Sequence, residues 1–296
     1  MSSDPAITME AVPRRAADRL PPHVFFLVSA VFHYLGPSFA VLLFASLAPA
    51  GVAWLRIASA GLVFALWRRP WRAFATLPSR DRIIIAALGA VLAAMNTLFY
   101  EAIARLPLAT VGAIEFFGPI ALAAWGMRTR RNLAALVLAT AGVYVLTGVR
   151  IAGEPLGYLF AFANCALFMA YIILGHRISA GAAGVSGIDR LGCAMLAATL
   201  AALPFGLSDA LPAFIDPKLL LAAIGVGISS SVIPYVCDQL AMARLPRASF
   251  ALLLSLLPAS AAVIGLIVLH QVPSFADAGG ILLVIVGVAL HQAERD

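Results

Sequence analysis

Long stretches without a single charged residue constrain this chain more than any other feature of its sequence. They are residues 21–55, 83–100, 132–149, 155–176, 191–208, 219–237 and 248–276. An α-helix needs about 20 apolar residues to cross the hydrocarbon core of a bilayer, so the longest stretches should each hold a complete crossing. Charged residues make up 11% of the chain, whereas a soluble domain carries about 25%. The sequence therefore predicts a multi-pass helical membrane protein.

Breaks at proline, glycine and charge clusters divide the chain into ten predicted transmembrane helices. They are residues 23–46, 49–67, 82–104, 108–126, 131–149, 155–177, 187–207, 217–243, 247–269 and 275–292. The segments are continuous and rich in Leu, Ala and Gly, as helical spans are. The alternation of polar and apolar residues that a transmembrane barrel requires is absent. The predicted fold class is an all-α membrane protein.

Basic residues between these segments predict how the protein is oriented. Clusters such as 68–72 and 128–131 fall on one side of the membrane. The other side receives only Arg105, Arg150 and Lys218. Because positively charged loops stay in the cytoplasm, we expect both chain ends inside a bacterial inner membrane, with residues 1–22 as a cytoplasmic tail. The net charge of +6 then reflects topology, and no nucleic-acid partner is expected.

A cleaved signal peptide is the alternative interpretation of the first segment. Arginines precede it, and Ala48-Pro49-Ala50 fits a small-x-small cleavage pattern. The apolar stretch is nearly twice as long as the usual signal core, which favours its retention as the first helix.

A repeated tetrapeptide indicates an internal duplication. ARLP occurs at residues 104–107 and again at 243–246, an offset of 139 residues. With this offset Pro119 falls on Pro258, so the fourth segment repeats as the ninth. Five segments, an odd number, separate the two copies, and the copies therefore cross the membrane in opposite directions.

Two inverted repeats of five helices each are thus predicted, at residues 23–149 and 155–292. Inverted repeats are typical of secondary transporters, in which the substrate site lies near the bilayer midplane between the two halves. Exchanging the conformations of the halves moves the site from one face to the other and provides alternating access. A duplication kept only for packing is the alternative.

Four segments carry a resemblance to a known family. They read PAGVAWLRIASAGLVFALWRRPWR (49–72), MNTLFYEAIARLPLATVGAIEFFGPIALA (95–123), AYIILGHR (170–177) and SSSVIPYVCDQLAMARLPRASFALLLSLLP (229–258). The chain resembles the ten-helix EamA family of the drug/metabolite transporter superfamily. The resemblance implies export of small amino acids or related metabolites by proton antiport. Alternative cargoes are purines and aromatic or cationic drugs, and a proton-independent facilitator is an alternative mechanism.

Glu115 is the candidate proton carrier. It lies about 11 Å along the fourth segment from Leu108, at 1.5 Å per residue, and hence close to the midplane. A carboxylate there costs a few kcal/mol unless it faces a partner, water or a cavity. Members of the family commonly carry acids at two further positions, but this chain has Leu257 and Gln271 there. Glu115 is therefore the only carboxylate near the centre of a span. A hydrogen bond that merely locks two helices is the alternative role.

Three prolines are expected to break helices inside the membrane, because a proline leaves the carbonyl four residues earlier without its N–H partner. They are Pro119, Pro234 and Pro258. The carbonyls freed in this way belong to Glu115, Ser230 and Leu254. Each needs a neighbouring donor or a polar cavity.

Arg56 is the second charge placed within a span, roughly 10 Å from the outer end of the second segment. Three roles remain open for it. It could pair with Glu115, hold the carboxylate of an amino-acid substrate through its planar fork, or extend to the outer surface.

Polar and aromatic residues on other segments are candidates for lining the transport pathway. Asn96, Phe99 and Tyr100 form a stripe on the third segment, and Asn96 corresponds under the repeat to Tyr235. Tyr171 is a weaker candidate. Residues expected to form interhelical hydrogen bonds are His33, Asn164 and Tyr144.

Two further acids lie near the ends of their segments. Asp238 is a candidate inner gate, with an interfacial pair to Arg244 as the alternative. Glu101 is expected to pair with Arg105.

Catalytic and cofactor motifs are missing from the sequence. The histidines are scattered, and neither HExxH, GxSxG nor a phosphate-binding GxxxxGK[ST] loop is present. We therefore expect no enzyme activity, no metal and no cofactor. The expected partners are a small-molecule substrate, protons and the lipid bilayer, and the sequence leaves a homodimer open.

Overall fold

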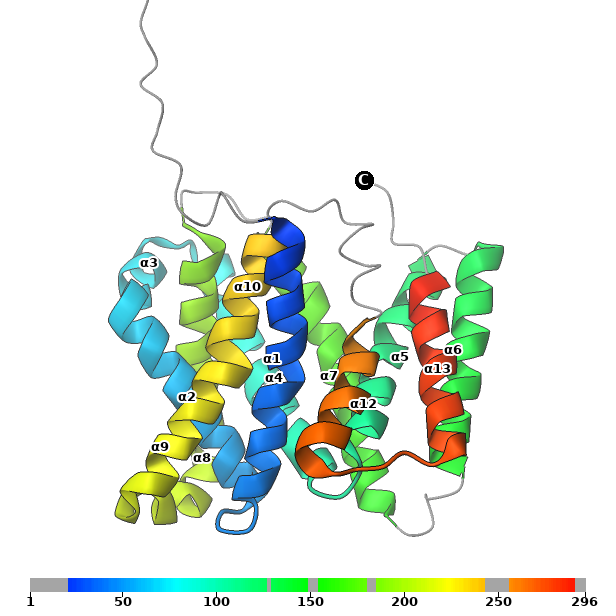
Figure 1. The fold of residues 1–296 in the computed structure, drawn as a ribbon. Helices are drawn as coiled ribbons and strands as arrows, with labels where there is room; N and C mark the ends of the chain where they lie inside the picture. Colours follow the sequence, from blue (N-terminus) through cyan, green and yellow to red (C-terminus); the bar gives the residue numbers. More distant parts are fainter. Residues whose placement is uncertain (1–20, 127–128, 149–153, 180–184, 243–255, 291–296) are drawn as a thin grey trace, which may run out of the picture.

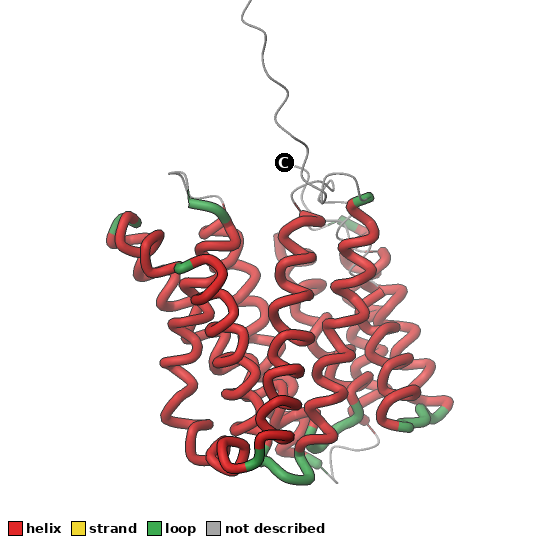
Figure 2. Tube along the Cα trace, turned by 60° about the vertical axis from the view of Figure 1, so that its left-hand side comes forward, coloured by secondary structure: helices red, strands yellow, loops and turns green. Residues whose placement is uncertain are grey.

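The computed structural model describes residues 21–126, 129–148, 154–179, 185–242 and 256–290. All regular structure in these ranges is helical. The helices lie side by side along a common direction, and the described loops gather at the two ends of the bundle (Figures 1 and 2).

The first half of the chain forms six helices. They are α1 (Pro22–Leu43), α2 (Pro49–Arg68), the short α3 (Pro70–Thr76), α4 (Ser79–Ile103), α5 (Leu108–Gly126) and α6 (Arg130–Gly148). The second half begins with α7 (Pro155–Ser179) and α8 (Gly187–Ile215). It continues with α9 (Pro217–Gly227), the π-helix η2 (Ile228–Val232), α10 (Ile233–Met242), α12 (Leu256–Leu269) and α13 (Phe275–Leu290).

The helix starts follow from local sequence. Proline occupies the first turn of α1, α2 and α9, where its missing N–H would have no intrahelical partner in any case. Asp216 caps α9 by accepting from the N–H groups of Lys218 and Leu219, and Ser186 caps α8 by accepting from that of Asp189.

Two expected segments differ from the structure. The segment predicted at 187–207 continues to Ile215, and α8 accommodates Pro204 and Pro212 in its interior. The segment predicted at 217–243 is helical over 217–242 but consists of α9, η2 and α10 in succession. The first part of the segment predicted at 247–269 lies outside the described residues.

Length and composition confirm that the protein is an all-α membrane protein. The helical segments long and apolar enough to cross a membrane are Val24–Leu43, Pro49–Arg68, Ser79–Ile103, Pro155–Gly175, Gly187–Ile215 and Pro217–Asp238. Shorter apolar helical segments are Leu108–Gly118, Leu257–Leu269 and Phe275–Leu290. The count of ten crossings stays a prediction.

Small residues let neighbouring helices come into backbone contact. A Cβ placed on Gly51 of α2 would lie 2.5 Å from the backbone of Asp209 in α8. A Cβ on Gly142 of α6 would lie 2.6 Å from the carbonyl oxygen of Gly280 in α13. Because lipid removes most of the hydrophobic drive for helix association, such close packing is a main source of stability in membrane bundles.

The directions of α4 and α10 agree with an inverted repeat. The rings of Tyr100, near the end of α4, and Phe44, just after α1, lie 6.0 Å apart, so these helices end together. Asp238, near the end of α10, lies beside Ser29 in the first turns of α1. α4 and α10 therefore run in opposite directions. The repeat bounds 23–149 and 155–292 remain predictions, and the second ARLP lies outside the described residues.

Candidate functional site

Glu115 and Arg56 both lie inside the bundle. Each is 5% exposed, Glu115 on α5 and Arg56 on α2. A buried ionised group is costly unless it is paired and hydrogen-bonded. The contacts of these two side chains therefore define the candidate site.

Glu115 joins α5 to α1 and α7. The Tyr34 hydroxyl of α1 donates to Glu115 Oε2 at 3.5 Å, and the Asn164 amide of α7 donates to Glu115 Oε1 at 3.2 Å. Gly112, one turn before Glu115, makes room for this contact, because a Cβ there would lie 2.9 Å from the Tyr34 hydroxyl. Asn164 is confirmed as an interhelical hydrogen-bonding residue.

Arg56 joins α2 to the π-helix η2. Its Nε donates to Ser231 Oγ at 2.8 Å, and its Nη2 donates to the Ser230 carbonyl at 2.9 Å. The guanidinium lies 5.4 Å from the centroid of the Tyr100 ring, a cation–π distance. The alternative in which Arg56 extends to the surface is wrong, because these bonds hold the side chain inside the protein. Arg56 also makes no ion pair with Glu115 within 4.0 Å.

Pro234 explains why the Ser230 carbonyl is available. A proline at this position has no N–H for the carbonyl four residues earlier, and Arg56 occupies that acceptor instead. Around it the backbone forms the π-helix Ile228–Val232, a distortion that is frequent at functional sites. Pro258 is buried on α12, but its partner carbonyl at Leu254 lies outside the described residues. α5 continues through Pro119 to Gly126.

Several buried polar atoms near these two charges have no well-formed hydrogen bond within the described residues. They are Tyr100 Oη, Ser230 Oγ and Asn164 Oδ1. The first two lie beside Arg56, and the third belongs to the partner of Glu115. Buried polar groups in folded proteins are almost always bonded, so each unsatisfied atom calls for an explanation.

Other predicted pathway residues surround the same region. Asn96 is 3% exposed and lies against Tyr235, its counterpart under the predicted repeat. Phe99 is buried, with its ring centroid 6.0 Å from that of Tyr100. Tyr171 on α7 is half-buried near Tyr235 and Asp238. The structure thus brings the predicted pathway residues together between α4, α7 and α10.

Two expectations at the segment ends have different outcomes. Glu101 and Arg105 form the predicted ion pair, with Arg105 Nη1 2.5 Å from Glu101 Oε2. Arg244, the alternative partner of Asp238, lies outside the described residues.

Tyr144, which was expected to form an interhelical hydrogen bond, is 73% exposed on the outer surface of the bundle.

Tyr34 is the site residue that sequence reasoning missed. It is fully buried and packs edge-on against the neighbouring His33, with ring centroids 5.2 Å apart. The sequence feature that could have indicated Tyr34 is its position two residues before Gly36-Pro37, a helix-disfavouring pair inside the first apolar segment.

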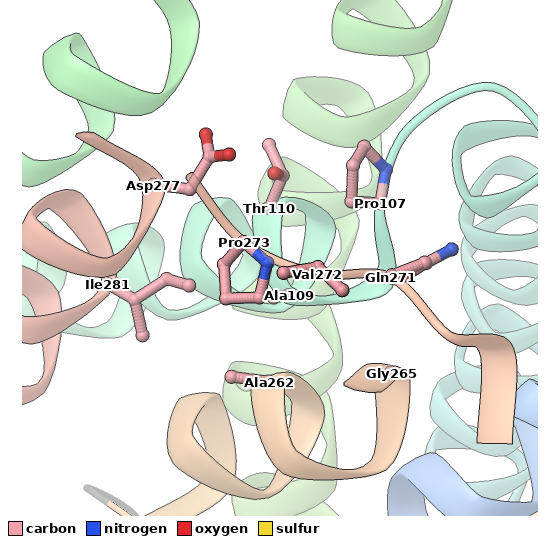
Figure 3. Close-up of a pocket in the computed structure, with 10 residues that line it drawn as sticks. All are labelled: Pro107, Ala109, Thr110, Ala262, Gly265, Gln271, Val272, Pro273, Asp277 and Ile281. Atoms are coloured by element: carbon pink, nitrogen blue, oxygen red, sulfur yellow. The ribbon is translucent and has the colours of Figure 1, made fainter. Parts of the chain in front are cut away.

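A pocket of about 160 Å³ that is lined by neither Glu115 nor Arg56 lies where the α4–α5 and α12–α13 connections meet (Figure 3). Its lining includes Pro107, Thr110, Gly265 and Gln271. Gln271 Oε1 accepts from the N–H of Leu108, the first residue of α5, at 3.0 Å. This bond satisfies one of the backbone donors that a helix start leaves unpaired.

Replacing Gln271 should therefore destabilise this end of the bundle. Gln271→Ala removes the acceptor for the Leu108 N–H, and loss of such a cap costs about 0.5–2 kcal/mol. We expect a lower thermal unfolding temperature in detergent. Gln271→Glu, which keeps an acceptor at a helix N-terminus, is the matched control. Equal unfolding temperatures for Gln271→Ala and the unaltered protein would show that the bond is not stabilising.

The chain is similar to known exporters over most of its length. It is 33% identical over 253 residues to the threonine/homoserine exporter RhtA of Escherichia coli strain K12, with 84% of each chain covered. It is 32% identical over 242 residues to the exporter of the same name from Salmonella typhimurium strain LT2, with 80% of this chain and 79% of the relative covered. The EamA-like transporter family model matches residues 155–291.

A solved crystal structure of another protein is also similar, with a TM-score of 0.58 and 18% sequence identity over 90% of this chain and 96% of that one. This likeness concerns the fold alone. A bundle of apolar helices that encloses buried charges, Glu115 and Arg56 among them, and that has relatives of this kind is a multi-pass membrane transporter. The chain belongs to the EamA-like transporter family. The expectation that it is not an enzyme is thereby confirmed.

Proposed function

We propose that the protein exports small amino acids related to threonine and homoserine across a bacterial inner membrane by proton antiport. The cargo is inferred from relatives that carry threonine and homoserine in their names and align over 84% of the chain. Proton coupling is inferred from the site. In this proposal both chain ends are cytoplasmic, and the predicted repeats exchange conformations to give alternating access.

The observation that carries the proposal is the setting of Glu115. Its carboxylate is buried and held by two neutral donors, Tyr34 and Asn164, with no cation within 4.0 Å among the described residues. An amide has both donor and acceptor atoms. The Asn164 NH₂ group can therefore donate to an ionised Glu115, and its unpartnered Oδ1 can accept from a protonated one. Asn164 can therefore hydrogen-bond to Glu115 in both of its protonation states, as a proton carrier requires.

The position of the site between the two predicted repeats supports alternating access. Glu115 and Arg56 belong to the first predicted repeat, whereas their partners Asn164, Ser230 and Ser231 belong to the second. A relative movement of the halves would break or remake these bonds. Proton affinity at Glu115 would then change with the state of the transporter.

A proton-independent facilitator is the second candidate. It is favoured by Leu257 and Gln271, neutral residues at positions where members of the family commonly carry acids. In this alternative, the hydrogen bonds of Glu115 would only hold α5 against α1 and α7.

Flux through proteoliposomes separates the two mechanisms. With an imposed pH gradient, we expect labelled threonine to accumulate against its own gradient, and a protonophore should abolish the accumulation. A facilitator would only equilibrate threonine, with or without the pH gradient. Liposomes without protein provide the background, and homoserine, a purine and a cationic drug added as competitors test the cargo. Inhibition by the purine or the drug, but not by homoserine, would contradict the proposed substrate class.

A further inference from the structure

The buried site contains two opposite charges that do not pair with each other. Arg56 and Glu115 are each 5% exposed, yet no ion pair within 4.0 Å joins them. They are close enough to interact electrostatically. Arginine stays charged in proteins, and a buried charge without a counter-charge is strongly destabilising. A ligand that carries both signs of charge would supply what each side chain lacks.

Arg56 has donors to spare. Of its five N–H groups, the structure engages one on Nε with Ser231 Oγ and one on Nη2 with the Ser230 carbonyl. The Nη1 atom makes no well-formed hydrogen bond to a described residue. Beside the guanidinium lie two fully buried hydroxyls, Tyr100 Oη and Ser230 Oγ, which lie near each other but form no well-formed hydrogen bond. A cation and two hydroxyl donors form a site suited to a carboxylate.

The Glu115 side offers the opposite chemistry. From the described residues, its two carboxylate oxygens accept one hydrogen bond each, from Tyr34 and Asn164. An ionised carboxylate has about four acceptor positions, so two remain. Asn164 Oδ1 is a further buried acceptor without a partner among the described residues. Carboxylate and amide oxygens together are suited to an ammonium group.

We propose that Arg56, together with the hydroxyls of Tyr100 and Ser230, binds the α-carboxylate of the transported amino acid, while Glu115 and Asn164 bind its α-ammonium group. This inference rests on the proposed function and adds a requirement to it. A zwitterion brings both counter-charges without changing the net charge of the site. A substrate that lacks either charged group leaves one buried side chain unpaired.

The inference also gives the ligand a role in coupling. The α-ammonium group and a proton compete for Glu115, so binding of either one displaces the other. The carboxylate contact at Arg56 does not take part in this exchange and sets recognition only. Arg56 is therefore assigned to substrate recognition and Glu115 to coupling.

Competition binding on the purified protein in lipid nanodiscs tests this assignment. Labelled threonine is displaced by threonine, by threoninamide, which lacks the carboxylate, and by N-acetylthreonine, which lacks the ammonium group. We expect each analogue to bind on the order of 100-fold more weakly than threonine, the scale of losing one partner of a buried charge contact. Equal binding of threonine and threoninamide would overturn the inference and leave threonine export intact.

The decisive measurement is the ratio of threonine to threoninamide affinity in variants. In Arg56→Gln this ratio should fall toward one, because the variant has lost the group that distinguishes the two ligands. Tyr100→Phe removes only a hydroxyl and should lower the ratio partially. It tests the same contact even if Arg56→Gln does not fold. Arg68→Gln, on the same helix but exposed and paired with Asp189, is the matched control and should keep the full ratio.

The outcomes separate the two proposals. An unchanged ratio in folded Arg56→Gln and Tyr100→Phe would show that Arg56 is only a structural link to η2. If neither threonine nor homoserine binds to the unaltered protein, the proposed function fails and the inference falls with it. If threonine binds and only the ratio fails to respond, the inference alone is overturned.

Discussion

Glu115→Gln is expected to abolish uphill export while leaving the fold intact. Glutamine has nearly the same shape as glutamate and can keep a hydrogen bond to Tyr34 or Asn164, but it cannot take up and release a proton. With an imposed pH gradient, threonine accumulation should fall to the background of empty liposomes. The amount of folded protein should be unchanged, because the substitution removes a buried charge and keeps the packing.

A second assay separates coupling from binding in this variant. Exchange of labelled for unlabelled threonine needs no proton gradient, and the amide oxygen at position 115 can still accept from an ammonium group. We therefore expect exchange to persist at raised threonine concentration. Glu101→Gln is the matched control, because Glu101 is paired with Arg105 near a helix end and should transport normally. Uphill accumulation by Glu115→Gln would remove Glu115 from the coupling mechanism.

Gly36→Ala is expected to disrupt the site through the backbone. A Cβ at Gly36 of α1 would overlap Ser230 Oγ and would lie 2.7 Å from Ser230 N and 2.8 Å from Ser230 Cα. Rotation of the serine side chain relieves only the first contact. The other two require η2 to move away from α1, which displaces the carbonyl that holds Arg56. Such overpacking costs about 1–3 kcal/mol.

Thermal unfolding and threonine binding measure this effect together. Gly36→Ala should unfold at a lower temperature and bind threonine weakly or not at all. Gly225→Ala is the control, because nothing lies within 4 Å of a Cβ at that position on α9. It should leave both properties unchanged or raise stability slightly, since alanine favours the helix. Normal binding by Gly36→Ala would mean that α1 and η2 separate without harm to the site.

Much of the fold could be predicted because it depends on short windows of sequence. The bounds of α2 and α5 agree with the predicted segments to within a residue, since proline, glycine and charged clusters punctuate apolar stretches of the right length. The same local signals predicted the Glu101–Arg105 pair. They failed at the end of α8, where Pro204 and Pro212 lie inside the helix. A proline can either end a helix or be accommodated by neighbours, and the packing decides which.

The candidate site, like the fold, could be predicted from the sequence only in part. The burial of Glu115 and the free carbonyl before Pro234 were predicted from residue type and spacing alone. The contacts of Tyr34 and Arg56 were not predicted, because each depends on which distant helix lies beside it. The distance from Arg56 to Ser231 in sequence is 175 residues, and that from Tyr34 to Glu115 is 81.

By itself, the sequence determined that the chain folds as an apolar helical bundle with a carboxylate at its centre, because membrane insertion is decided by the hydrophobicity of about 20 consecutive residues. Only the tertiary structure decided that Arg56 turns inward to η2 and that Glu115 is held by α1 and α7. The physical reason is that inside lipid each buried polar atom must find its partner within the protein. That partner is selected by helix packing, through contacts between segments far apart in the chain.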